Sequence, residues 1–155
     1  MIQVSNLSNA ASLLWHAYAS LPAPSQKVNW AGFYIREDKF YRPATSAQEA
    51  SPKKDLLVLG PFQGKPACQA IAFGKGVCGV AAASKQTTLV ADVDTFPGHI
   101  ACDGESKSEI VVPILVDDEV VAIIDIDCAV ESGFDEEDSK GLEALAAALA
   151  QGCDW

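Results

Sequence analysis

Two apolar segments in the second half of the chain restrict the possible folds more than any other feature. Residues 109–116, EIVVPILV, and residues 119–127, EVVAIIDID, are rich in β-branched side chains and meet around the polar residues 117–119, DDE. Runs of this composition on either side of a polar turn are typical of paired β-strands. Because so short a connection joins only antiparallel strands, the chain is expected to build its sheet around this hairpin.

The register of this hairpin decides where three carboxylates lie. Asp125 and Asp127 are two residues apart, so both side chains leave the same face of a strand, together with those of Val121 and Ile123. A three-residue turn at 117–119 pairs Glu109 with Asp127 and brings all three carboxylates together, whereas a two-residue turn places Glu109 on the opposite face. Carboxylates that end an apolar strand need water, partners or a ligand. A strand that simply emerges into water explains them as well as an acidic pocket does.

An acidic pocket has chemical consequences. Like charges crowded together raise the pKa of at least one carboxyl group. Such a group stays protonated near neutral pH and can act as an acid. A cation, for example the ammonium group of a ligand, relieves the same repulsion.

The rest of the chain alternates between helical and strand-like patterns. Apolar residues recur at helical spacing over residues 6–21 and again from Asp135 towards the C-terminus. Further strands are expected at 28–35, 56–60, 67–73 and 87–91, with a Pro/Gly turn at 61–66 and a short helix after a glycine-rich turn within 74–85. This order predicts an α+β fold, with a central antiparallel sheet of about six strands and helices mainly on one face.

Size and charge narrow the class of protein. A chain of 155 residues is expected to form one domain, residues 1–155, and the charged, Pro/Ser/Ala-rich stretch 37–55 is expected to be an exposed insertion. A net charge of −10 argues against binding nucleic acid or an anionic membrane. Neither a signal peptide nor an apolar run of about 18 residues is found, so a cytoplasmic protein is expected.

Five cysteines raise the question of redox chemistry. Their odd number argues against a structural disulfide framework, and without CxxC or zinc-finger spacing no metal site is predicted. Cys78 follows glycines at a predicted helix N-terminus beside Lys75, and both features favour the thiolate. Cys102 lies in a hydrophilic segment near His99 and Lys107, where exposure favours reactivity. Local chemistry alone therefore favours Cys78 as the thiol of lowest pKa.

Trp30 and Tyr34 are four residues apart on a predicted strand, so they share a face. Packing in the core is the simpler explanation of this pair. The alternative is an aromatic pocket wall for a small apolar or cationic group.

Long motifs in the sequence resemble the free methionine-R-sulfoxide reductases, which are small enzymes with the GAF fold. The resemblance covers the chain from Asn29 to the last helix, and Cys68, Cys78 and Cys102 show the family's spacing of ten and twenty-four residues. The longer stretch at 37–55 is the main departure. The motifs are NWAGFY, LVLGPFQGKPAC, GKGVCG, FPGHIACDGESKSEIVVPI and DIDC…GFDEED.

The resemblance implies a reaction, the reduction of free L-methionine-(R)-S-oxide to methionine. Thioredoxin, itself reduced by NADPH through thioredoxin reductase, is the implied electron donor, with no bound cofactor or metal. The resemblance implies that Cys102 attacks the sulfur, that Cys68 is the main resolving cysteine and that Cys78 is an auxiliary thiol. This order departs from the local pKa reasoning, and it is adopted because the predicted carboxylates lie next to Cys102 in sequence.

The resemblance also implies a substrate site. Trp30 and Tyr34 match residues that enclose the methyl end of the substrate, and Glu109, Asp125 and Asp127 match carboxylates that hold its sulfoxide oxygen and amino group. The rival hypothesis is a GAF module without catalytic activity that senses a small ligand or cysteine oxidation. Such modules usually belong to longer signalling chains. The sequence leaves the oligomeric state open, a homodimer included.

Overall fold

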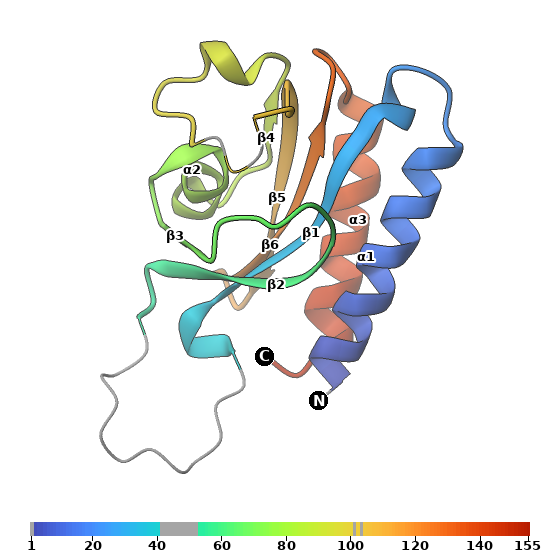
Figure 1. The fold of residues 1–155 in the computed structure, drawn as a ribbon. Coiled ribbons are helices and arrows are strands. Elements are labelled where there is room, and N and C mark those ends of the chain that lie inside the picture. The colour runs from blue at the N-terminus through green and yellow to red at the C-terminus, as the bar shows by residue number, and fades with distance from the viewer. Residues whose placement is uncertain (1, 41–52, 101, 103) are drawn as a thin grey trace.

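The protein is built around one curved sheet with helices on both faces. The computed structural model describes the chain except residues 1, 41–52, 101 and 103. In the described part, six antiparallel strands follow the order β3-β2-β1-β6-β5-β4. Helices α1 and α3 lie side by side on one face of the sheet, and the short helix α2 lies on the other (Figure 1). The predicted α+β sheet with helices mainly on one face is confirmed.

The element bounds follow the predicted pattern closely. The helices are α1 (Ile2–Ser20), α2 (Gly76–Ser84) and α3 (Glu136–Gly152), with single 3₁₀ turns η1 (Ser25–Lys27), η2 (Glu37–Lys39) and η3 (Val93–Thr95). The strands are β1 (Val28–Arg36), β2 (Leu56–Gly64), β3 (Ala70–Ala72), β4 (Thr88–Val90), β5 (Ser108–Val116) and β6 (Glu119–Cys128).

Strand β2 is longer than the sequence predicts. The segment from Pro61 to Gly64 was expected to be a turn, but it continues the strand and pairs with β1, where Phe62 lies opposite Gly32. Because glycine has no side chain, Phe62 can cross over β1 at this point; a Cβ on Gly32 would clash with the Cβ of Phe62. Phe62 is thereby held over the α2 face of the sheet.

The β5–β6 hairpin combines features of both predicted registers. Its turn has only two residues, Asp117 and Asp118, both with positive φ. This geometry is typical of tight hairpin turns. A β-bulge between Ile114 and Leu115 then shifts the pairing, so that Glu109 lies opposite Asp127. The expectation that a two-residue turn moves Glu109 to the other face is wrong, because the bulge adds the residue that restores the alternation.

The two faces of the sheet have separate apolar cores. Phe33 and Ile124 belong to the core under α1 and α3, while Tyr34 and Ile123 belong to the core under α2. The alternating side chains of β1 and β6 therefore send one aromatic and carboxylate-bearing set towards α2. Among the described residues, no helix has the length and apolar character to cross a membrane.

Most of the predicted insertion 37–55 lies outside the described residues. Its described ends are joined, since the backbone N–H of Lys53 donates a hydrogen bond to Glu37 Oε2 at 2.8 Å. Its exposure stays a prediction.

Candidate active site

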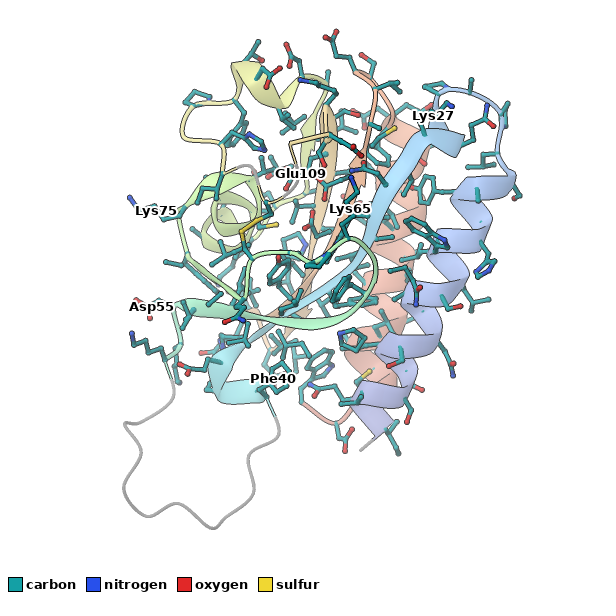
Figure 2. All side chains as sticks on the ribbon, viewed as in Figure 1. Lys27, Phe40, Asp55, Lys65, Lys75 and Glu109 are labelled. Atoms are coloured by element: carbon teal, nitrogen blue, oxygen red, sulfur yellow. A yellow bond between two sulfur atoms is a disulfide. The ribbon has the colours of Figure 1, made fainter. Side chains whose placement is uncertain are left out.

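A cavity on the α2 face of the sheet gathers the predicted site residues. It has an empty volume of about 530 Å³, which includes its open mouth, and walls from β1, α2, β5, β6 and two loops. Figure 2 shows the labelled Glu109 and the yellow bond of a disulfide on this side of the molecule. Cys68 does not line the cavity but is bonded to Cys102, which does. The other predicted site residues line it: Trp30, Tyr34, Cys78, Cys102, Glu109, Asp125 and Asp127.

The three carboxylates form a compact acidic group. Glu109 and Asp125 are only 6% and 5% exposed, and Asp127 is half-buried. Burial raises the pKa of Asp125 to about 6, although hydrogen bonding to Cys78 and Glu109 opposes the rise. Burial also raises the pKa of Glu109 well above its usual range, and the charges of Asp125 and Asp127 add to this. Glu109 therefore keeps its proton under conditions where an exposed carboxyl group has lost it.

Cys78 is a buried thiol inside the acidic group. Its Sγ donates a hydrogen bond to Glu109 Oε1 at 3.5 Å. Burial raises the pKa of Cys78 well above its usual value, and the charges of Asp125 and Glu109 raise it further. The prediction that Cys78 has the lowest pKa is therefore wrong. The helix N-terminus and Lys75 favour the thiolate, but desolvation and nearby carboxylates outweigh them.

This acidic group has unused capacity to bind a cation. Asp125 Oδ1 is buried and has no hydrogen-bond partner among the residues described. Donor atoms of Cys78, Glu109 and Asp125 lie within 4.8 Å of one another, close enough to hold a metal ion. A ligand ammonium group satisfies the same oxygen atoms with hydrogen bonds as well as charge.

Two aromatic side chains, Trp30 and Tyr34, line the cavity, and a third ring supports them from behind. Trp30 stacks on Tyr34 with ring centroids 5.8 Å apart and on Phe62 at 5.2 Å. The Tyr34 hydroxyl donates a hydrogen bond to the carbonyl oxygen of Cys68 at 3.0 Å. Trp30 and Tyr34 are thus both core residues and cavity wall. Nothing in the sequence pattern singled out Phe62, because it lies in the segment expected to be a turn.

A disulfide joins the two loops at the cavity mouth. Cys68 and Cys102 are bonded, with Cα atoms 5.5 Å apart, while Cys78 stays a free thiol. The same two loops are linked by an ion pair between Lys65 Nζ and Glu105 Oε2 at 2.6 Å. The bonded thiols are the two to which the resemblance assigns attack and resolution.

His99 was noted in the sequence only as a neighbour of Cys102. In the structure its ring lines the cavity, with Nε2 3.8 Å from Glu109 Oε2. Burial lowers its pKa, and the charge of Asp94 opposes this. Only the FPGHIAC motif, which places a histidine three residues before Cys102, could have drawn attention to it.

Comparisons with known proteins show the family to which the chain is similar. The GAF domain family model matches residues 26–153. The free methionine-R-sulfoxide reductase of Saccharomyces cerevisiae is 54% identical over 97% of this chain and 75% of its own length. The enzyme of that name from Escherichia coli is 42% identical over 94% of this chain and 74% of its own length.

A solved structure also shares the fold. The free methionine-R-sulfoxide reductase from Neisseria meningitidis, in complex with its substrate, superposes with a TM-score of 0.78 and 40% identity. The match covers 96% of this chain and 76% of that one.

Proposed function

Since the chain belongs to the free methionine-R-sulfoxide reductase family and has its GAF fold, we propose that it reduces free L-methionine-(R)-S-oxide to methionine. One observation carries the proposal beyond family membership. A single cavity is lined by Cys102, which is bonded to Cys68, and by buried carboxyl groups of raised pKa.

The walls of the cavity suit the two ends of this substrate. The rings of Trp30 and Tyr34, with Phe62 stacked on Trp30, offer an apolar surface for the methyl group on sulfur. The acidic side offers Asp125 Oδ1, which is buried without a hydrogen-bond donor in the described part of the chain. An ammonium group placed there supplies a donor and a positive charge together.

The chemistry follows from the protonation states. Glu109 holds a proton that it can give to the sulfoxide oxygen, which leaves poorly until it is protonated. Cys102 attacks the substrate sulfur and takes up its oxygen, so methionine leaves and a sulfenic acid remains on Cys102. Cys68 then attacks this sulfenic acid, water is released and the disulfide forms.

The enzyme must next be reduced. We infer that thioredoxin, supplied with electrons by NADPH through thioredoxin reductase, exchanges its dithiol with the Cys68–Cys102 bond. Cys102 is exposed and Cys68 half-buried, so an external dithiol can reach this bond. Such a cycle requires a reducing compartment, for which the cytoplasm is proposed. Whether one chain or a homodimer carries out the cycle is measured by sedimentation velocity.

A single-turnover experiment tests the assignment of the thiols. Pre-reduced enzyme is mixed with substrate in the absence of reductant, and methionine is quantified after quenching. The wild-type enzyme and Cys68→Ser should each form about one methionine per chain, because attack precedes resolution. Cys102→Ser should form none. A full turnover by Cys102→Ser transfers the role of nucleophile to Cys78, and binding without any methionine from the wild-type enzyme favours a sensing module.

Selectivity for the free amino acid is a separate prediction. In N-acetylmethionine sulfoxide the ammonium charge is absent, so the buried carboxylates stay uncompensated at a cost of several kcal/mol. The value of kcat/KM should fall by at least about 100-fold relative to the free amino acid. Equal kcat/KM values for the two substrates contradict the assigned role of Asp125 and its neighbours.

A further inference from the structure

His99 is the least explained group in the cavity. It lies on the loop between η3 and β5, where its backbone N–H donates to the carbonyl oxygen of Phe96 at 3.1 Å. Its side chain is 16% exposed and its Nε2 lies 3.8 Å from Glu109 Oε2. The partly exposed ring therefore lies next to a deeply buried carboxyl group.

Burial and the neighbouring charges together set the pKa of the His99 ring, and burial has the larger effect. Lys107 Nζ already pairs with Asp94 at 2.9 Å, so the nearest negative charge on the η3 side is partly neutralised. Because burial lowers the pKa of His99, the ring is neutral at pH 7 and is able to accept a proton. The charge of Asp94 on η3 acts on the ring, and the titratable groups that share its cavity are Lys75 and Cys78 from the start of α2, Glu109 from β5, and Asp125 and Asp127 from β6.

In the proposed reaction the Cys102 thiol loses a proton, and the group that accepts this proton has still to be identified. Cys102 starts as a thiol and must lose a proton to attack, while the sulfoxide oxygen must gain one. Glu109 can supply the second proton but then needs another. His99 shares a loop with Cys102, three residues before it, and shares the cavity with Glu109.

We propose that His99 relays the proton of the Cys102 thiol to Glu109, a role that rests on the proposed function. Nε2 takes the thiol proton as the Cys102 sulfur forms its bond to the substrate sulfur. Glu109 gives its proton to the sulfoxide oxygen, and the imidazolium returns a proton to Glu109. The bond between the two sulfur atoms then breaks as the oxygen passes to Cys102, so the substrate sulfur is reduced to the thioether and the thiol is oxidised to the sulfenic acid. No proton is gained or lost overall.

A glycine in a conformation that favours glycine directly precedes His99. Gly98, directly before His99, has a positive φ of 76°, and a Cβ there would meet nothing within 4 Å. Its backbone is thus in a conformation that glycine adopts without strain, in open space. In the disulfide state Cys102 is held by Cys68, and reduction of that bond releases the thiol for the relay.

The test measures single-turnover methionine formation at saturating substrate, with pre-reduced enzyme, from pH 5 to pH 9. The variants are His99→Gln and His99→Ala. The matched control is His16→Gln, because His16 is the other of the two histidines and lies exposed on α1. Circular dichroism and thermal melting check that each variant folds.

At pH 7 the rate of methionine formation should fall about 100-fold in both His99 variants. It should not fall in His16→Gln. The wild-type rate should reach a plateau above the lowered pKa of His99. The His99→Gln rate should instead keep rising with pH, since hydroxide then removes the thiol proton. Added imidazole should raise the rate of His99→Ala in proportion to the imidazole concentration. The rate of the wild-type enzyme should not change.

Two results overturn the relay. The first is a His99→Gln variant with the rate and pH profile of the wild type. The second is a pair of slow His99 variants whose rates keep the wild-type plateau with pH and do not respond to imidazole, which indicates a purely structural role. Failure of the proposed function looks different, because the wild-type enzyme itself then forms no methionine. If His99→Ala does not fold, the pH profile of His99→Gln decides.

Discussion

At the scale of single residues, the acidic group is placed for binding at the expense of stability. Asp125 is buried, one of its oxygens lacks a hydrogen-bond donor in the described structure, and its pKa is raised to about 6. Cys78 adds a thiol whose pKa is raised by the same burial and the same charges. A bound substrate ammonium group compensates the cost of burying the Asp125 carboxylate, and this compensation is absent in the free protein.

Replacing Asp125 should therefore stabilise the free protein. Between the ordinary aspartate pKa of 3.8 and the folded pKa of about 6, the folded carboxyl keeps a proton that the unfolded chain releases. The free energy of unfolding of the wild type thus falls as the pH rises from about 4 to about 6. Asp125→Asn has no such proton, so its advantage should grow over this range to roughly 2 kcal/mol. Urea unfolding at pH 4 and pH 7 measures it.

The control for this prediction is Asp117→Asn, which changes an exposed carboxylate in the β5–β6 turn. Its stability relative to the wild type is measured at the same two pH values. The same Asp125→Asn protein should bind substrate more weakly. An Asp125→Asn variant that is less stable at pH 7 than at pH 4, relative to the wild type, contradicts the raised pKa.

At the scale of elements, helix α2 is positioned by a close approach to the sheet edge. The backbone of Gly79 meets β3 so closely that a Cβ there would clash with the carbonyl oxygen of Ala72. Cys78 is the preceding residue, so this approach sets how deep the thiol lies beside Glu109. The absence of a side chain at Gly79 is therefore part of the architecture of the cavity.

Gly79→Ala should cost about 2 kcal/mol of stability, because backbone atoms cannot move aside as a flexible side chain can. The matched control is Gly141→Ala in α3, where a Cβ meets nothing within 4 Å. That change should stabilise the protein by about 0.5–1 kcal/mol. Thermal melting of both variants checks the contrast, and two similar shifts in Tm would be evidence against the close approach.

The hairpin is the second element on which the site depends. The bulge after Ile114 compensates for the two-residue turn, and Glu109 thereby faces the cavity beside Asp127. Without that bulge the same turn would bury Glu109 against α3, among apolar side chains. The site thus depends on a local irregularity of the ladder.

At the scale of the whole molecule, the disulfide connects two loops that are far apart in the sequence. Cys68 precedes the edge strand β3, Cys102 precedes β5, and the bond closes a loop with a sequence separation of 34. A cross-link of this length restricts the unfolded chain, which stabilises the folded state by about 3.5 kcal/mol when the native geometry is unstrained.

Oxidation should therefore raise the unfolding midpoint of the wild-type protein. Urea unfolding with and without a reductant should differ by up to about 3.5 kcal/mol in the free energy of unfolding. Cys68→Ser cannot form the bond, so its stability should be the same in both conditions. Equal stability of oxidised and reduced wild type, with the disulfide verified by mass spectrometry, speaks against this estimate.

Much of the fold could be predicted because its signals are local. Alternation along residues 119–127 places Asp125 and Asp127 on one face whatever the rest of the chain does, and the acidic start after Asp135 suits the capped N-terminus of α3. Alternation does not report a bulge, however, so Val121 was expected beside Asp125 but belongs to the other core. The role of the Pro61–Gly64 segment was missed because its strand exists only through pairing with β1.

Local sequence was enough to specify most strands and helices, the shared face of Asp125 and Asp127, and the motifs of the family. Three-dimensional packing was needed to show that Cys78 is a thiol of raised pKa, that His99 lines the cavity, that Phe62 supports Trp30 and that Glu109 joins the other carboxylates. The reason is physical. Side-chain direction follows from the backbone of a few neighbouring residues, whereas desolvation and charge coupling depend on atoms that distant segments bring together.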